Sequence, residues 1–296
     1  QSEVNAVAIS PDGETIVSGS SDNTLRLWNR QGQQIAVLRG HQNSVWAVAI
    51  SPDGETIVSG GGNILTGLGD NTLRLWNRQG QQIGVLRGHQ GSVAALAISP
   101  DGETIVSGSN DNTLHLWNRQ GESIGILRGH QNWVRAVAIS SDGETIISGS
   151  FDNTVRLWNR QGQQIGVRLG HQIWVEAVAI SPDGETIISG NRNTLHLWNR
   201  QGESIRVLRG HQDVVSAVAI SPDGQTIVSG SGDNTLRLWN RQGEPIGEPL
   251  RGHQDSVNAV AFSSDGETIV SGSGDNTLRL WNRQGEPIGE PLRGHQ

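Results

Sequence analysis

One short segment, TLRLWNRQG or a close variant of it, recurs seven times along this chain of 296 residues. The intervals between its tryptophans are 48, 41, 41, 40, 41 and 42 residues, and a Gly-His pair recurs in step with them. The recurring tryptophans are Trp28, Trp76, Trp117, Trp158, Trp198, Trp239 and Trp281. A fixed period of this length indicates a repeat architecture, in which each unit is one small structure that buries its faces against its neighbours.

Each repeat is predicted to form four short β-strands. In the second repeat, residues 45–50 alternate and are rich in β-formers, and the Ser-Pro-Asp-Gly sequence that follows is a tight turn. Residues 56–59, 72–76 and 83–86 are the next three strands, and Asn-Arg-Gln-Gly forms a turn between the last two. Because no segment has helical periodicity over ten residues, no helix is expected.

A four-stranded unit of this size cannot bury both of its faces alone, whereas a ring of seven units covers every face. A linear stack would need polar end caps, and none is visible in the sequence. We therefore predict a single all-β domain, a closed seven-bladed β-propeller with four antiparallel strands per blade. The predicted blades span about residues 1–40, 41–88, 89–129, 130–170, 171–210, 211–252 and 253–296.

Composition narrows the possible partners and surroundings. The formal net charge is −7 and no basic run occurs, so no nucleic-acid partner is expected. With no cysteine, disulfides and thiolate metal sites are excluded. No apolar run approaches the roughly 18 residues of a membrane helix, so we expect no membrane partner and a cytoplasmic location. The chain starts in mid-repeat without an initiator methionine, from which we expect a monomeric domain of a larger protein.

The Gly-His, Ser-Gly-Ser, Asp-Asn-Thr and Leu-Trp-Asn motifs resemble those of the WD-repeat family over the whole chain, although asparagine replaces the aspartate of the signature dipeptide. The resemblance implies a tetrad in each blade, in which hydrogen bonds run from tryptophan to serine to histidine to aspartate. The complete tetrads are expected at His41, Ser59, Asp70 and Trp76; His89, Ser107, Asp111 and Trp117; His130, Ser148, Asp152 and Trp158; His211, Ser229, Asp233 and Trp239; and His253, Ser271, Asp275 and Trp281.

Three blades depart from this pattern. The first has Ser18, Asp22 and Trp28, but its histidine would precede Gln1. His295 stands one period after His253, the histidine of the last blade, and we predict that it completes this tetrad and seals the ring, with no strand shared between the first and last blades. The second blade carries a seven-residue insertion around 61–69.

The fifth blade is one residue short, so that Arg192 stands where the aspartate is expected. His171 should therefore lack its carboxylate partner, and this tetrad should be the weakest.

Serine, histidine and aspartate in one unit could indicate a hydrolase. Seven copies of the trio, with no glycine-flanked nucleophile, favour a structural network instead, so we predict neither an enzyme nor a cofactor. His115 and His196 are the two histidines outside the period, and each replaces an arginine on the third strand. Because they lie two blades apart, no metal site is predicted.

The repeats differ mainly at three places: after the Gly-His-Gln segment, at the start of the first strand, and before the aspartate of the turn that follows the second strand. These places should meet on one face, which the resemblance identifies as the usual partner-binding face. The candidate binding residues are Trp46, Trp133, Arg135, Phe151, Ile173, Trp174, Glu176 and Val214, with Ile64, Leu65 and Leu68 of the insertion adding apolar surface.

Three tryptophans outside the repeated motif, Trp46, Trp133 and Trp174, stand at sites expected to be exposed and indicate an interaction surface. The alternative is that they fill the channel mouth or arose by drift after a recent amplification of the repeat.

The leading hypothesis is a protein-interaction scaffold or sensor that binds a protein or peptide, by analogy with propellers in bacterial signalling proteins. The alternative is a carbohydrate-binding propeller, in which exposed tryptophans would stack on sugar rings. The uneven distribution of aromatic residues among the repeats favours one asymmetric partner.

Overall fold

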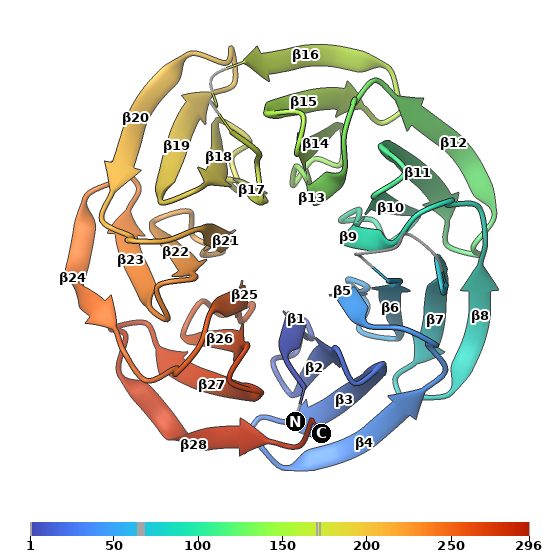
Figure 1. The fold of residues 1–296 in the computed structure, drawn as a ribbon, viewed down its shortest axis with the longest axis horizontal. Coiled ribbons are helices and arrows are strands. Elements are labelled where there is room, and N and C mark those ends of the chain that lie inside the picture. The colour runs from blue at the N-terminus through green and yellow to red at the C-terminus, as the bar shows by residue number, and fades with distance from the viewer. Residues whose placement is uncertain (1, 64–68, 170, 172, 296) are drawn as a thin grey trace.

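The computed structural model describes residues 2–63, 69–169, 171 and 173–295, and these form a ring of seven four-stranded sheets around a central opening (Figure 1). Every sheet consists of four strands consecutive in the chain, and all pairings are antiparallel. The predicted seven-bladed β-propeller is confirmed. Within the described residues there is no helix, and hence none long and apolar enough to cross a membrane.

The strands occupy equivalent places in the seven blades. The innermost strands are β1 (Val4–Ile9), β5 (Val45–Ile50), β9 (Val93–Ile98), β13 (Val134–Ile139), β17 (Ala177–Ile180), β21 (Val215–Ile220) and β25 (Val257–Phe262). The second strands are β2 (Thr15–Ser20), β6 (Thr56–Gly61), β10 (Thr104–Ser109), β14 (Thr145–Ser150), β18 (Thr186–Asn191), β22 (Thr226–Ser231) and β26 (Thr268–Ser273).

The third strands are β3 (Thr24–Asn29), β7 (Leu73–Asn77), β11 (Thr113–Asn118), β15 (Thr154–Asn159), β19 (Thr194–Asn199), β23 (Leu236–Asn240) and β27 (Thr277–Asn282). The outermost strands are β4 (Gln34–Arg39), β8 (Gln82–Leu86), β12 (Ser123–Arg128), β16 (Gln164–Leu169), β20 (Ser204–Arg209), β24 (Pro245–Leu250) and β28 (Pro287–Arg293). In the second blade, the second strand is longer than predicted, because Gly60 and Gly61 pair with Ala47 and Val45 of the innermost strand.

The hydrophobic core lies between blades. Between the first and second blades, Leu25 and Leu27 pack with Val45 and Trp76, and each of these side chains is at most 2% exposed. Side chains of this size contribute about 1.5–3 kcal/mol each when fully buried. Since neighbouring blades build each such cluster jointly, a blade is stabilised mainly by its neighbours.

The ring closes by the same packing. Val4 and Trp28 of the first blade form one cluster with Leu278, Leu280 and Leu292 of the last. Among the described residues, the sheet of the first blade contains only β1–β4 and that of the last only β25–β28, so no strand of residues 2–295 is shared across the closure. The two ends of the ribbon meet at this junction (Figure 1).

Arginine–aspartate pairs link neighbouring blades. The arginine lies in the turn between the third and fourth strands of one blade, and the aspartate lies in the turn between the first and second strands of the preceding blade. Arg78 Nη2 lies 2.5 Å from Asp12 Oδ2 of the preceding blade, and Arg119 pairs with Asp53 at the same distance. Across the closure the corresponding pair, Arg30 with Asp265, is 3.9 Å apart. Because these pairs are exposed, each contributes little to stability, typically about 0.2–1 kcal/mol.

The glycine of each Ser-Gly-Ser motif allows the blades to approach closely. A Cβ atom on Gly272 would lie 2.7 Å from Val4 Cγ1 and 3.0 Å from Val7 Cγ1, across the closure. The first of these distances is shorter than a carbon–carbon contact permits, so a larger residue here must push the first and last blades apart.

We expect Gly272→Ala to destabilise the protein by about 1–3 kcal/mol, the usual cost of overpacking a core. The measurement is the midpoint of thermal or urea unfolding. Gly125→Ala on β12 is the matched control, because a Cβ there would be 3.4 Å from its nearest neighbour, Leu116 Cδ1. Equal midpoints for the two variants would contradict the close-approach role.

Candidate functional site

The fourth blade illustrates the hydrogen-bonded tetrad. Trp158 Nε1 donates to Ser148 Oγ over 2.8 Å, Ser148 Oγ lies 2.7 Å from His130 Nε2, and His130 Nδ1 lies 2.8 Å from Asp152 Oδ2. Because the indole N–H can only donate, the serine hydroxyl passes its own proton to Nε2, and Nδ1–H donates to the carboxylate. Every one of these three hydrogen bonds of the tetrad thus has both a donor and an acceptor.

The same three contacts, each 2.7–2.9 Å long, occur in the other blades predicted to be complete. They join Trp76, Ser59, His41 and Asp70; Trp117, Ser107, His89 and Asp111; Trp239, Ser229, His211 and Asp233; and Trp281, Ser271, His253 and Asp275. All these tryptophans are at most 2% exposed, so the tetrads are part of the scaffold.

The first blade obtains its histidine from the far end of the chain. His295 Nε2 lies 2.8 Å from Ser18 Oγ, and His295 Nδ1 lies 2.9 Å from Asp22 Oδ2. Trp28 Nε1 donates to the same serine over 2.9 Å. His295 is 3% exposed, so its contacts join the two ends of the chain within the core.

His295→Ala should lower the midpoint of thermal unfolding, at a cost of about 1–3 kcal/mol, because it removes the acceptor of the buried Ser18 hydroxyl proton and one hydrogen-bond donor to the Asp22 carboxylate. Removing residues 292–296 should cost more, since Leu292 also leaves the closure core. Arg293→Ala is the control, because this neighbouring side chain is exposed. An unchanged midpoint for His295→Ala would exclude a sealing role for the histidine.

The tetrad aspartates remain ionised in the folded protein. Burial acts to raise the pKa of Asp152, but hydrogen bonds from His130 and Thr154 outweigh burial and hold this pKa well below its usual range. The same balance lowers the pKa of Asp22, Asp70, Asp111, Asp233 and Asp275.

A depressed carboxyl pKa in the folded state stabilises the protein above the unfolded-state pKa, about 3.9. We therefore expect the free energy of unfolding to fall as the pH drops below about 4, where the unfolded chain takes up protons that the folded one does not. Asp152→Asn should be less stable than the wild type at pH 7, and this difference should shrink between pH 5 and pH 2.5. Urea unfolding at several pH values measures it, with Glu248→Gln at an exposed position as the control. The same dependence on pH for both variants would contradict the role of Asp152.

The fifth blade has an incomplete tetrad, as predicted. Trp198 Nε1 donates to Ser189 Oγ, which lies 2.7 Å from His171 Nε2, but no aspartate follows. Burial, followed by the positive charge that His196 can carry, lowers the pKa of His171 to about 3, and the neighbouring Asn191 side chain opposes this shift only weakly.

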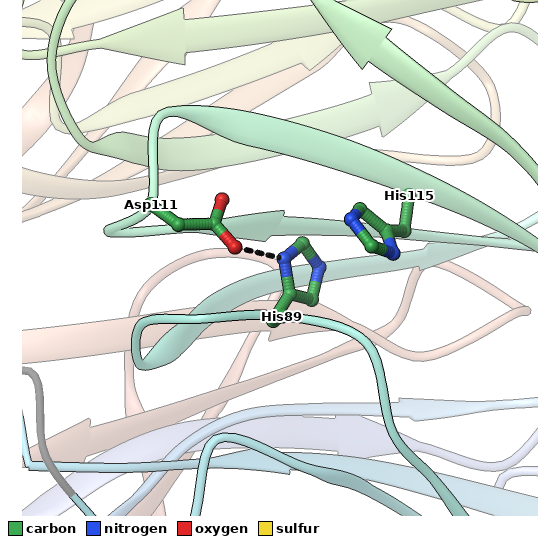
Figure 2. Close-up of side chains that lie close together, drawn as sticks. All are labelled: His89, Asp111 and His115. Atoms are coloured by element: carbon green, nitrogen blue, oxygen red, sulfur yellow. Dashed lines mark hydrogen bonds and ion pairs between the residues drawn. The ribbon is translucent and has the colours of Figure 1, made fainter.

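The structure places His115 next to His89, a neighbour that the distance between His115 and His196 in the sequence did not indicate. Its ring lies 4.0 Å from that of His89, centroid to centroid, and Figure 2 shows both rings with Asp111, which is bonded to His89. Nitrogen and oxygen atoms of the three side chains lie within 4.8 Å of one another, so they could hold a metal ion. Both His89 nitrogens already serve the tetrad, so an ion there would have to displace Asp111.

The variable residue at the start of each innermost strand faces the mouth of the central channel. A hollow of about 220 Å³ is lined there by Glu3, Asn5, Trp46, Ala94, Arg135, Glu176, Ser216 and Asn258. In the described strands, six of these residues are the extra residue of a β-bulge; in β13, for example, Val134 and Ala136 pair with the second strand and Arg135 does not. A bulge leaves its extra residue unpaired and redirects that side chain, with a local disruption of the strand pairing.

An aromatic and charged cluster lies beside this mouth. The rings of Trp133 and Phe151 stack with centroids 5.6 Å apart, and Trp174 lies 5.5 Å from Phe151 on its other side. The guanidinium carbon of Arg135 is 5.6 Å from the Phe151 ring centroid and 5.9 Å from that of Trp46. Arg135 Nε also lies 3.4 Å from Glu176 Oε2. Arg135 thus connects the fourth blade to the second and the fifth.

Of the three additional tryptophans, only Trp174 is as exposed as expected, at 44%. Trp133 is half-buried against Phe151, and Trp46 is half-buried with its Nε1 donating to Gly62 O over 2.9 Å. Ile173 and Val214 have aliphatic side chains and are not part of this stack of aromatic rings. Ile64, Leu65 and Leu68 lie outside the described residues. We call Trp46, Trp133, Arg135, Phe151, Trp174 and Glu176 the mouth surface.

The seven repeats match those of a known protein family. The sequence profile of the family described as "WD domain, G-beta repeat" matches residues 1–29, 32–77, 80–118, 121–159, 162–199, 202–240 and 243–282. The chain is 44% identical over 43 residues to a human protein named "WD repeat-containing protein 86". That match covers 14% of this chain, about the length of one of its repeats, and 11% of the human protein.

Proposed function

We propose that this chain, which belongs to the WD-repeat family, binds a protein or peptide partner on the mouth surface. Propellers of this family generally serve as protein-interaction scaffolds and are typically not enzymes. That this chain is one domain of a larger, cytoplasmic bacterial signalling protein stays a prediction.

The observation that carries the proposal is the combination of aromatic rings with an incompletely satisfied arginine. Tryptophan and arginine are the residues most enriched among those that dominate binding energy at interfaces. Arg135 Nη1 has no hydrogen-bond acceptor among the described residues, although its Nε pairs with Glu176. Arg135 Nη1 is buried, so a peptide carbonyl at the mouth would supply its acceptor once the guanidinium turns toward the peptide, while apolar side chains of the same peptide would cover Trp174.

The arrangement favours a peptide over a sugar. Stacking on a sugar needs an open aromatic face, but Phe151 lies between Trp133 and Trp174 and contacts both rings. In addition, the aromatic residues occupy only some blades, which fits one asymmetric ligand.

Trp174→Ala should weaken binding of peptides selected on the wild-type protein from a random display library by about tenfold or more, the loss typical of an aromatic anchor. Since the Trp174 side chain is exposed, the unfolding midpoint should stay within about 1 °C of the wild type. Fluorescence anisotropy with a labelled selected peptide measures the dissociation constant.

Ile205→Ala is the matched control, because Ile205 is an exposed apolar residue on the outermost strand of the same blade, at 55% exposure. Equal affinities for Trp174→Ala and Ile205→Ala would place the binding site elsewhere. Binding on a glycan array that Trp174→Ala abolishes, without any selected peptide, would favour the carbohydrate alternative.

A further inference from the structure

The fifth blade contains a polar cavity beside its incomplete tetrad. His171 itself does not line this cavity, but its ring lies 4.5 Å, centroid to centroid, from that of His196, which does. The cavity measures about 290 Å³ and lies between the short turn after β18 and the end of β20. Its lining consists of Ile173, Asn191, Arg192, Asn193, Thr194, His196, Val207 and Arg209. Ile173 immediately precedes Trp174 of the mouth surface in the chain.

The shortened turn changes which residue replaces the missing aspartate. Alignment of the repeats places Arg192 there, but in the structure Asn191 extends β18, pairs with Thr194 and accepts a hydrogen bond from its hydroxyl over 2.8 Å. In the fourth blade the Asp152 carboxylate accepts the corresponding bond from Thr154 over 2.6 Å. Asn191 therefore takes over the contact with threonine, but an amide brings no negative charge to the histidine.

His171 is left with an unsatisfied donor. Trp198 donates to Ser189, whose hydroxyl in turn donates to His171 Nε2, so the neutral ring carries its proton on Nδ1. His171 is 8% exposed, and its Nδ1 has no hydrogen-bond partner among the residues that the structure describes. A buried donor of this kind needs an acceptor, and in the complete blades that acceptor is a carboxylate.

Two arginines give the cavity a positive charge. Arg192 and Arg209 both line it, and neither is among the arginines that form ion pairs within the described ranges. No acidic residue is part of the lining, although the chain as a whole has a net charge of −7.

The backbone at Arg192 is also unusual. Its φ is 36°, in the left-handed region that, apart from glycine, only asparagines adopt elsewhere in the described chain. A strained residue of this kind often marks a functional site.

From these observations we propose that the cavity is a carboxylate-binding site. One oxygen of the ligand pairs with Arg192 and Arg209, and the other accepts the hydrogen bond from His171 Nδ1 as the Asn191 amide turns aside. The ligand thus completes a tetrad that the chain leaves open. The site is distinct from the mouth surface, and it does not depend on a partner binding there.

Sodium acetate is the first probe, compared with sodium chloride at the same ionic strength. At an acetate concentration of about ten times the dissociation constant, the midpoint of thermal unfolding should rise by roughly 2–4 °C. It should also shift the indole N–H resonance of Trp198, which is linked to His171 through Ser189. Identical midpoints and Trp198 resonances in the two salts would overturn the proposal.

Matched variants separate this site from general salt effects. Arg209→Ser should abolish the response to acetate, whereas Arg39→Ser should retain it, because Arg39 ends the outermost strand of the first blade, where Asp22 completes the tetrad. Asn191→Asp introduces an internal carboxylate, and it should raise the midpoint in chloride and remove the response to acetate. Equal responses of Arg209→Ser and Arg39→Ser, or an unchanged response of Asn191→Asp, would contradict the assignment.

The carboxylate could belong to a small molecule or to an acidic side chain of a peptide. The blocked tripeptide Gly-Glu-Gly, with Gly-Gln-Gly as its control, distinguishes these sources. Tenfold tighter binding of the glutamate peptide than of acetate identifies a peptide ligand, and equal or weaker binding identifies a small carboxylate. If the two tripeptides bind equally well and acetate has no effect, the site does not recognise carboxylates.

Discussion

Each blade buries its faces only against its neighbours, and the rest of the structure depends on this constraint. A sheet whose apolar side chains lie on both faces gains most of its stabilisation from contacts that it cannot make alone. Removing one interface would therefore affect the stability of the whole ring. This explains why the junction between the first and last blades carries the same cluster of valine, leucine and tryptophan side chains as the other interfaces.

The tetrads fix the relative orientation of the elements that this packing brings together. A hydrophobic interface tolerates small shifts, but a chain of three hydrogen bonds in the core fixes the histidine-bearing loop relative to the second and third strands. At the closure the same chain of bonds joins Ser18 to His295, residues nearly a whole chain apart. Covalent connection is absent at this junction, and hydrogen bonds and packing together take its place.

The fold could be predicted from the sequence because the signals were periodic. The position of His295, one period after His253 of the last blade, was enough to predict its partner in the first. The bulges at Trp46 and Arg135 could not be predicted, because an unpaired residue depends on the register between two strands. Nor could the stacking of Phe151 between Trp133 and Trp174, since this depends on how the loops of neighbouring blades approach one another. In the fifth blade, alignment placed Arg192 in the aspartate position, whereas the strand pairing gives that place to Asn191.

The bulges at the channel mouth separate the identity of a side chain from the stability of the sheet. Residues such as Ala94, Arg135 and Ser216 have no partner across the strand, so exchanging one for another need not repack an interface. A library that randomises these positions, leaving the valine and alanine on either side unchanged, would thus vary the rim of the channel on a constant framework. The propeller is in this respect a natural starting point for engineered binders, with the places open to diversification already marked by its own repeats.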